Sequence, residues 1–173
     1  IIRKISLFTN VEKRAVISAY DVKSTIYEIP LIFHEQQLDE IVLEKLNLQS
    51  GKADLKRWSK MVDTINTATQ EVTVGLVGKY IELNDSYKSI NEALCHGGIA
   101  HQARIKLERI DSEHLDTEEQ LSAALDRLDA ILIPGGFGQR GIEGMINAAR
   151  YAREHKIPTF GICLGMQIMV IEY

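Results

Sequence analysis

The chain has 173 residues, of which 45% are apolar and 25% charged, with a formal net charge of −4. This is ordinary globular composition, and the negative charge argues against a nucleic-acid partner. No stretch approaches the roughly 20 apolar residues of a membrane span, and no signal-peptide run opens the sequence, so we expect no membrane partner. Cys95 and Cys163 show neither disulfide-framework nor metal-ligand spacing, which indicates a reducing, cytoplasmic setting and gives no metal ligand.

The first 50 residues are too few for a domain of their own. We predict a strand over 5–8, an extended segment over 16–22 and an amphipathic helix over 35–46. Residues 49–54 are polar and contain a glycine, which indicates a break. An apolar stripe at spacings of three and four then predicts a connecting helix; it consists of Leu55, Trp58, Val62 and Ile65.

From residue 71 onward, short apolar runs alternate with helical patterns. We predict strands over 72–77, 104–110, 130–133 and 159–162, and helices over 86–94, 117–128, 144–154 and from about 164. Such alternation is typical of an α/β fold with a doubly wound, flavodoxin-like, mostly parallel sheet. The expected organisation is therefore a tail of another domain over 1–50, a linker with a helix over 51–70, and an α/β domain over 71–173.

Cys163 lies where a buried strand is followed by a helix. Gly161 and Gly165 bracket it, and both permit backbone angles or close approaches that a side chain would forbid, so a sharp turn with the sulfur at its tip is expected. A helix N-terminus favours negative charge there and supplies N–H donors. Cys163 is therefore a candidate nucleophile; the alternative is a buried structural cysteine.

A second glycine turn follows another predicted strand. The run AILIP over 130–134 leads directly into GGFGQRG over 135–141. In a parallel sheet the carboxyl ends of the strands lie on one edge, so this turn and the cysteine turn should face each other. The N–H groups of Gly135 and Gly136 would then supply part of an oxyanion hole. A phosphate-binding loop or a plain turn is the alternative.

Together these residues resemble the class I (triad) glutamine amidotransferases, whose nucleophile turn reads GxCxGxQ and whose oxyanion strand ends in PGG. Longer segments resemble the glutaminase domain of the CTP synthase family: EVTVGLVGKYIELNDSYKSINEAL over 71–94 and the IPGGFGQRGIEGM run that ends at Met145. Upstream, RKISLFTNV, AVISAYDV and IYEIP resemble the closing part of that family's synthetase domain, which is a P-loop-type α/β domain. The resemblance covers nearly all of the chain.

The resemblance implies glutamine hydrolysis through a thioester on Cys163, with the oxyanion on the N–H groups of Gly136 and Leu164. Gln167 would help to hold the amino-acid head of glutamine, unless it is only a solvent-facing helix residue. The family takes its base from a later His-x-Glu pair, and this sequence has none. We therefore expect an internal piece of a longer protein that cannot turn over glutamine alone, and we assign surface or helix-end positions to its histidines: His34, His96, His101, His114 and His155.

Nucleotide contacts are implied in the same way. Phe137 and Arg140 resemble the segment that binds the activator GTP, although simple packing and solvation would also explain them. The resemblance also places Phe137 in the glutamine-binding set. The loop with Lys79, Tyr80, Asp85 and Lys88 resembles a segment that affects GTP activation and ammonia coupling; a solvated charge cluster is the alternative. Asp21 and Val22 resemble the segment beside the adenine of ATP, where Tyr20 replaces a common lysine and one residue is inserted.

For the complete protein the resemblance implies ATP-dependent amination of UTP to CTP in a homotetramer, with Mg²⁺ held by residues outside this chain. The implied small-molecule partners are glutamine, UTP, ATP and GTP. The alternatives are another class I glutamine amidotransferase, a peptidase or chaperone with a cysteine elbow, and a non-catalytic assembly piece. The GGFGQRG and KYIELNDSYKS segments favour the CTP synthase family over another amidotransferase. A peptidase or chaperone would not need Gln167 or the paired glycines, and the assembly role stays open.

Overall fold

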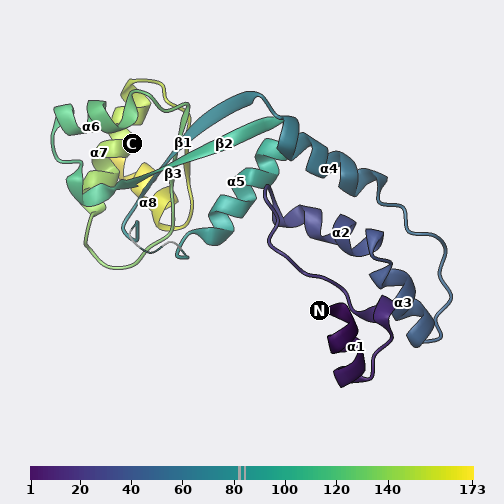
Figure 1. Cartoon of the computed structure of the whole chain (residues 1–173). Coiled ribbons are helices and arrows are strands. Elements are labelled where there is room, and N and C mark those ends of the chain that lie inside the picture. The colour runs from purple at the N-terminus through teal and green to yellow at the C-terminus, as the bar shows by residue number, and fades with distance from the viewer. Residues whose placement is uncertain (82, 84) are drawn as a thin grey trace. The chain divides into compact units, whose positions relative to one another are not determined.

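The structure is a computed structural model that describes residues 1–81, 83 and 85–173. The chain divides into two compact units, 1–67 and 68–173 (Figure 1), so the connecting helix groups with the N-terminal residues. The expected domain limits at 50 and 70 remain predictions. We describe each unit by itself.

The described residues of the N-terminal unit form helices joined by irregular segments, and none of them lies in a strand. It contains α1 (Ile2–Thr9), α2 (Ile29–Glu35), α3 (Leu38–Lys45) and α4 (Lys56–Thr67), with short 3-10 turns at Lys13–Ala15 and Ile26–Glu28. The strand predicted over 5–8 is wrong, because these residues lie inside α1. A short apolar run does not distinguish strand from helix, and here Asn10 ends a helix by adopting φ 54° and donating its N–H to the carbonyl of Ser6.

The helix predicted over 35–46 starts too early. Gln37 adopts φ 61° and ψ 27°, so α2 ends at Glu35 and α3 begins at Leu38. Nδ1 of His34 lies 2.7 Å from a carboxylate oxygen of Asp39 across this break. The left-handed residue ends the first helix, which periodicity alone cannot reveal.

The connecting helix is confirmed as α4. Trp58 lies on its inner face, where its indole nitrogen donates a 2.6 Å hydrogen bond to the carbonyl of Tyr27 and its ring lies 6.1 Å from the tyrosine ring. Val62, one turn further along, is buried. The stripe that predicted the helix is thus the face that packs within the N-terminal unit.

The second unit has the predicted α/β order. In sequence it comprises β1 (Gln70–Gly78), α5 (Lys88–Ala100), β2 (Ala103–Asp111), a 3-10 turn at Ser112–His114, α6 (Glu118–Leu125), β3 (Ala130–Ile133), α7 (Ile142–Glu154), β4 (Thr159–Gly161) and α8 (Leu164–Glu172). The four strands are all parallel, in the order β2-β1-β3-β4. The predicted doubly wound parallel sheet is confirmed.

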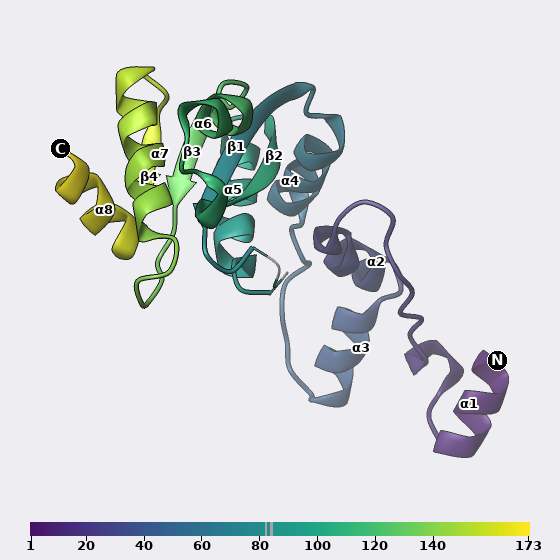
Figure 2. The same cartoon turned by 90° about the vertical axis from the view of Figure 1, so that its left-hand side faces the viewer.

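Side chains alternate in direction along the strands and so contribute to two hydrophobic cores, one on each face of the sheet. Val77 and Ile133 point to the face covered by α6, α7 and α8, whereas Leu76 and Leu132 point to the face that α5 covers. Helices α7 and α8 lie next to each other in both views (Figures 1 and 2). Each fully buried aliphatic side chain contributes about 1.5–3 kcal/mol of hydrophobic stabilisation, so these cores fix the sheet on which the loops stand.

Strand order reverses between β1 and β3. From β1 the chain adds β2 on one side, then crosses over to place β3 and β4 on the other. The carboxyl ends of β1 and β3 therefore flank a topological switch point, which is where open α/β sheets bind their ligands. Among the described residues β4 pairs with β3 alone, and Phe160 on β4 is 65% exposed.

Candidate active site

Cys163 stands at the N-cap of α8 in a backbone conformation that non-glycine residues rarely adopt, with φ 52° and ψ −105°. A sharp turn between β4 and α8 imposes these angles and leaves the residue exposed. Such angles cost on the order of 1–3 kcal/mol and are concentrated at functional sites. The same geometry presents the nucleophile of other strand-turn-helix elbows, so the predicted turn is confirmed and the buried structural cysteine is excluded.

The two glycines around Cys163 are required by close backbone packing. A Cβ on Gly161 would lie 2.4 Å from the carbonyl carbon of Gly165, and a Cβ on Gly165 would lie 1.9 Å from the carbonyl oxygen of Ile133. No side chain fits at these distances. The glycines therefore let α8 start directly against the end of β3, which brings Cys163 to the neighbouring strand's loop.

The glycine turn after β3 faces the cysteine turn, as predicted. Ile162 donates its N–H to the carbonyl of Ile133 at 2.9 Å, so the strand ends are in register. A Cβ on Gly135 would lie 3.6 Å from the Cβ of Cys163, and one on Gly136 would lie 3.3 Å from a methyl carbon of Leu164. The residues expected to form the oxyanion hole are thus brought together around the thiol.

The rest of the glycine turn is tied to the carboxyl ends of β1 and β2. The Arg140 guanidinium pairs with the Glu113 carboxylate and donates a 2.8 Å hydrogen bond to the carbonyl of Lys79. Glu113 is not among the residues predicted from the sequence. It lies two residues after β2, so the rule that parallel strands end on one edge would have pointed to it.

The other predicted residues of this unit lie at the same edge but make different contacts. Gln167 is exposed on α8, where its N–H binds the carbonyl of Cys163 one turn earlier. Phe137 is 87% exposed, Lys88 is exposed at the start of α5, and Lys79 is 3% exposed. Their assignment to glutamine or GTP remains a prediction.

The remaining predicted contact lies in the N-terminal unit. Asp21 is exposed and Val22 half-buried, in a segment without helix or strand. A cavity of about 1010 Å³ lies elsewhere in this unit and is lined by residues between Pro30 and Leu55. Adenine binding by Asp21 and Val22 therefore remains a prediction.

Histidines in both units have specific structural partners. His155 stacks on Tyr151 at 3.8 Å, and His34 pairs with Asp39 in the N-terminal unit.

Burial raises the pKa of the other cysteine, Cys95, which lies on α5. Within residues 1–81, 83 and 85–173, no group of three or more His, Cys, Asp or Glu side chains could hold a metal ion.

Comparison with known proteins agrees with this geometry. Residues 82–173, more than half of the chain, match the family model "Glutamine amidotransferase class-I". The chain belongs to the class-I glutamine amidotransferases. Residues 1–48 match a second model, "CTP synthase N-terminus", so the particular proteins that this chain resembles in both parts are the CTP synthases.

A solved structure supports the same relationship. The glutaminase domain of the Trypanosoma brucei CTPS with bound acivicin matches with 42% sequence identity and a TM-score of 0.54. The match covers 58% of this chain and 39% of the other, so this chain spans well under half of that relative. None of the described helices is both long and apolar enough to cross a membrane.

Proposed function

We propose that this chain supplies the glutamine-splitting nucleophile of a CTP synthase. The observation that carries the proposal is the strained, exposed Cys163 turn facing Gly135 and Gly136. It lies in a chain that matches the class-I glutamine amidotransferase model over residues 82–173 and the CTP synthase N-terminus model over residues 1–48. The thiolate would attack the side-chain carbonyl carbon of glutamine, and the N–H groups of Gly136 and Leu164 would bind the resulting oxyanion.

The bond changes are those of acyl transfer. A bond forms between sulfur and carbon while the carbon–nitrogen bond breaks, and ammonia leaves after taking up a proton. Water then cleaves the thioester, which gives glutamate and restores the thiol. In the complete enzyme, the ammonia would aminate UTP at the expense of ATP, with Mg²⁺ as a cofactor that is not consumed and GTP as activator.

Proton transfer in these steps requires a base. We propose a His-x-Glu pair that the 173 residues do not contain. The chain by itself should therefore be alkylated at Cys163 by a glutamine-like electrophile but should not release ammonia catalytically. Ammonia release by this chain, abolished in Cys163→Ala, would contradict the missing base while supporting the nucleophile.

Acivicin is the suitable probe, because the similar trypanosomal structure carries it. We expect mass spectrometry to find one acivicin adduct on Cys163, with a rate that glutamine reduces by competition and no adduct in Cys163→Ala. The other cysteine provides an internal control, since Cys95 is partly buried on α5. Equal modification of both cysteines, insensitive to glutamine, would overturn the proposal.

A second assay distinguishes CTP synthase activity from the activity of another amidotransferase and from an assembly role. The intact protein should convert UTP to CTP with ATP and either glutamine or free ammonia. Glutamine-dependent activity should disappear in Cys163→Ala, whereas ammonia-dependent activity should persist, because only ammonia supply uses the thiol. Glutaminase activity without UTP amination would assign the chain to a different amidotransferase.

We further propose that main-chain groups near Asp21 and Val22 bind the adenine of ATP. These residues lie outside helix and strand, with Asp21 exposed and Val22 half-buried. Because such contacts would use main-chain groups, side-chain replacement should matter little. The test is Val22→Pro, which removes one N–H donor and should raise the KM for ATP without changing the KM for glutamine.

A further inference from the structure

Lys79, immediately after β1, is a buried lysine whose ammonium group points into the glycine turn. Only 3% of the residue is exposed. Its Nζ donates hydrogen bonds to the carbonyl oxygens of Gly138 and Phe137, the latter at 3.3 Å. Lysine is almost never buried to this extent without partners that stabilise its charge, so the two carbonyls hold the ammonium in place.

The stem of the same side chain lies beside the expected oxyanion donors. A Cβ on Gly136 would lie 3.6 Å and 3.7 Å from the Cδ and Cε atoms of Lys79, and 3.3 Å from Leu164. Lys79 and Leu164 therefore both lie against Gly136 at the place where a side chain would stand. Since β1 and β3 flank the topological switch point, this contact joins the two strand ends that border it.

Further hydrogen bonds hold the two strand ends together. The carbonyl of Lys79 accepts from Arg140, and the Tyr80 hydroxyl accepts from the N–H of Phe137 at 3.5 Å. Tyr80 is itself placed by Tyr87, whose buried hydroxyl accepts the Tyr80 N–H at 3.2 Å. The turn is thus tied to β1 on both of its sides.

We propose that Lys79 is a positioning residue for the oxyanion hole: by binding the carbonyls of Phe137 and Gly138, it orients the turn so that the Gly136 N–H faces the developing oxyanion. The inference rests on the proposed glutaminase function. An oxyanion donor acts through placement, and a shift of about 1 Å in such a group costs on the order of a hundredfold in rate. Lys79 need not touch glutamine to affect the reaction.

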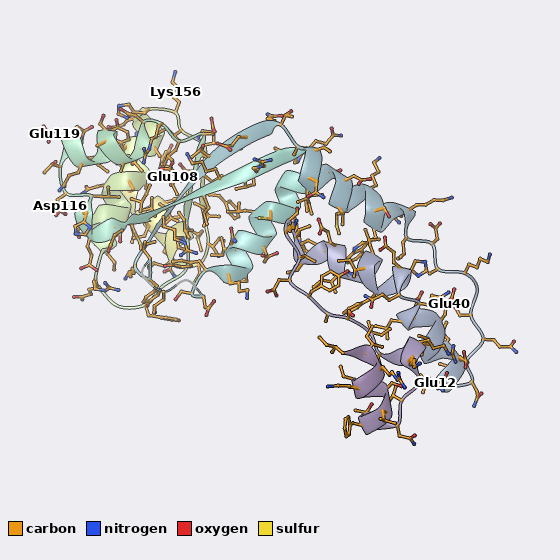
Figure 3. All side chains as sticks on the ribbon, viewed as in Figure 1. Glu12, Glu40, Glu108, Asp116, Glu119 and Lys156 are labelled. Atoms are coloured by element: carbon orange, nitrogen blue, oxygen red, sulfur yellow. The ribbon has the colours of Figure 1, made fainter. Side chains whose placement is uncertain are left out.

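The test compares Lys79→Met, Lys79→Gln and Lys79→Arg in the intact protein, with Lys156→Met as the control. Lys156 projects into solvent (Figure 3) and adopts a positive φ. Methionine, like lysine, is unbranched, so Lys156→Met changes only the charged end of an exposed side chain. We expect the Met and Gln variants to lose about 10- to 100-fold in kcat for glutamine hydrolysis, with KM changed less than about twofold. Lys79→Arg should recover part of the loss, and the control should match the wild type.

Two readouts distinguish positioning from a general loss of structure. The rate at which iodoacetamide alkylates Cys163 should be unchanged, because alkylation forms no oxyanion, and ammonia-dependent CTP formation should also be unchanged. Wild-type kcat in Lys79→Met or Lys79→Gln would overturn the inference. Unfolding of both variants by circular dichroism would also overturn it, by making Lys79 a folding residue. If the wild type itself hydrolyses no glutamine, the proposed function fails instead.

Discussion

Gly165 and Ile133 are in backbone contact: a Cβ on Gly165 would lie 1.9 Å from the carbonyl oxygen of Ile133. The first turn of α8 therefore rests directly on the end of β3. The position of Cys163 relative to the glycine turn depends on residue 165 being a glycine, which has no side chain. Gly97, in the exposed part of α5, offers the contrasting case, since nothing lies within 4 Å of a Cβ there.

We predict that Gly165→Ala displaces α8 and lowers the rate of acivicin labelling at Cys163 at least tenfold, together with a stability loss of about 1–3 kcal/mol typical of overpacking. Gly97→Ala should instead stabilise its helix by about 0.5–1 kcal/mol and leave labelling unchanged. Urea titration and mass spectrometry measure the two effects. Wild-type labelling in Gly165→Ala would show that the contact does not place the thiol.

A second prediction concerns the strained angles of Cys163. Glycine adopts positive φ without steric cost, so Cys163→Gly should be more stable than Cys163→Ala by about 1 kcal/mol, although both lose the nucleophile. The alanine variant is the matched control because it removes the thiol and keeps the Cβ. Equal urea midpoints for the two variants would show that the turn is not strained at this residue.

The α7–α8 pair predicts a dependence on pH. Arg153 donates hydrogen bonds to both carboxylate oxygens of Glu172, at 3.0 Å and 2.6 Å, and this lowers the pKa of Glu172 below its ordinary 4.5. A carboxylate with a lowered folded-state pKa stabilises fully above pH 4.5, and the stabilisation is lost as pH falls through the folded value. Thermal melts between pH 7 and 3 should show this loss.

The control for that experiment is on the same arginine. Glu172→Gln should flatten the acid side of the stability profile, whereas Glu154→Gln should not, because Glu154 is half-exposed and lies 3.8 Å from Arg153. A profile that keeps its slope in Glu172→Gln would assign the acid sensitivity to other carboxylates.

The N-terminal unit carries its own acid-sensitive group. Glu12 lies between α1 and the next turn (Figure 3), and hydrogen bonds from Lys45 and Arg14 lower its pKa to about 2. Its contribution should therefore be present above pH 4.5 and be lost between pH 4.5 and 2. The only tryptophan of the chain, Trp58, lies in this unit, so its fluorescence reports the transition.

We expect the unfolding transition reported by Trp58 fluorescence to depend less on pH in Glu12→Gln than in the wild type. High salt should weaken the pH dependence of the wild type in the same way, because the ion pairs are exposed. Glu35→Gln is the control, since Glu35 is exposed and its replacement leaves this ion-pair network intact. An unchanged transition in Glu12→Gln would mean that the exposed network does not stabilise the unit.

Activation by GTP provides the last prediction. Phe137 is 87% exposed, so Phe137→Ala should cost less than about 0.5 kcal/mol of stability. Any loss of GTP stimulation of glutaminase activity in the intact protein would then report a lost ligand contact. Arg140→Ala should lose stimulation too but also loosen the turn, because Arg140 pairs with Glu113. Phe8→Ala, at an 84% exposed site, is the control. Unchanged stimulation in both variants would exclude this GTP site.

The second unit was predictable because its signals are local and repeated. Four apolar runs separated by helical patterns indicate a parallel sheet, and the rule for strand ends then brings Gly135 to Cys163. The burial of Lys79 was not predictable, since nothing in GKY distinguishes a solvated lysine from one enclosed by a loop 58 residues later. Helix α1 was not predicted for another reason. The run ISLF is compatible with a strand or a helix, and contacts with neighbouring residues decide between the two.

The exposed strand β4 has a consequence for handling the protein. Its outer edge presents unpaired backbone groups among the described residues, beside the apolar side chains of Phe160 and Ile162. Open, apolar strand edges act as templates on which another chain adds a strand. Self-association should therefore rise with concentration, so reactivity at Cys163 should be measured in dilute solution.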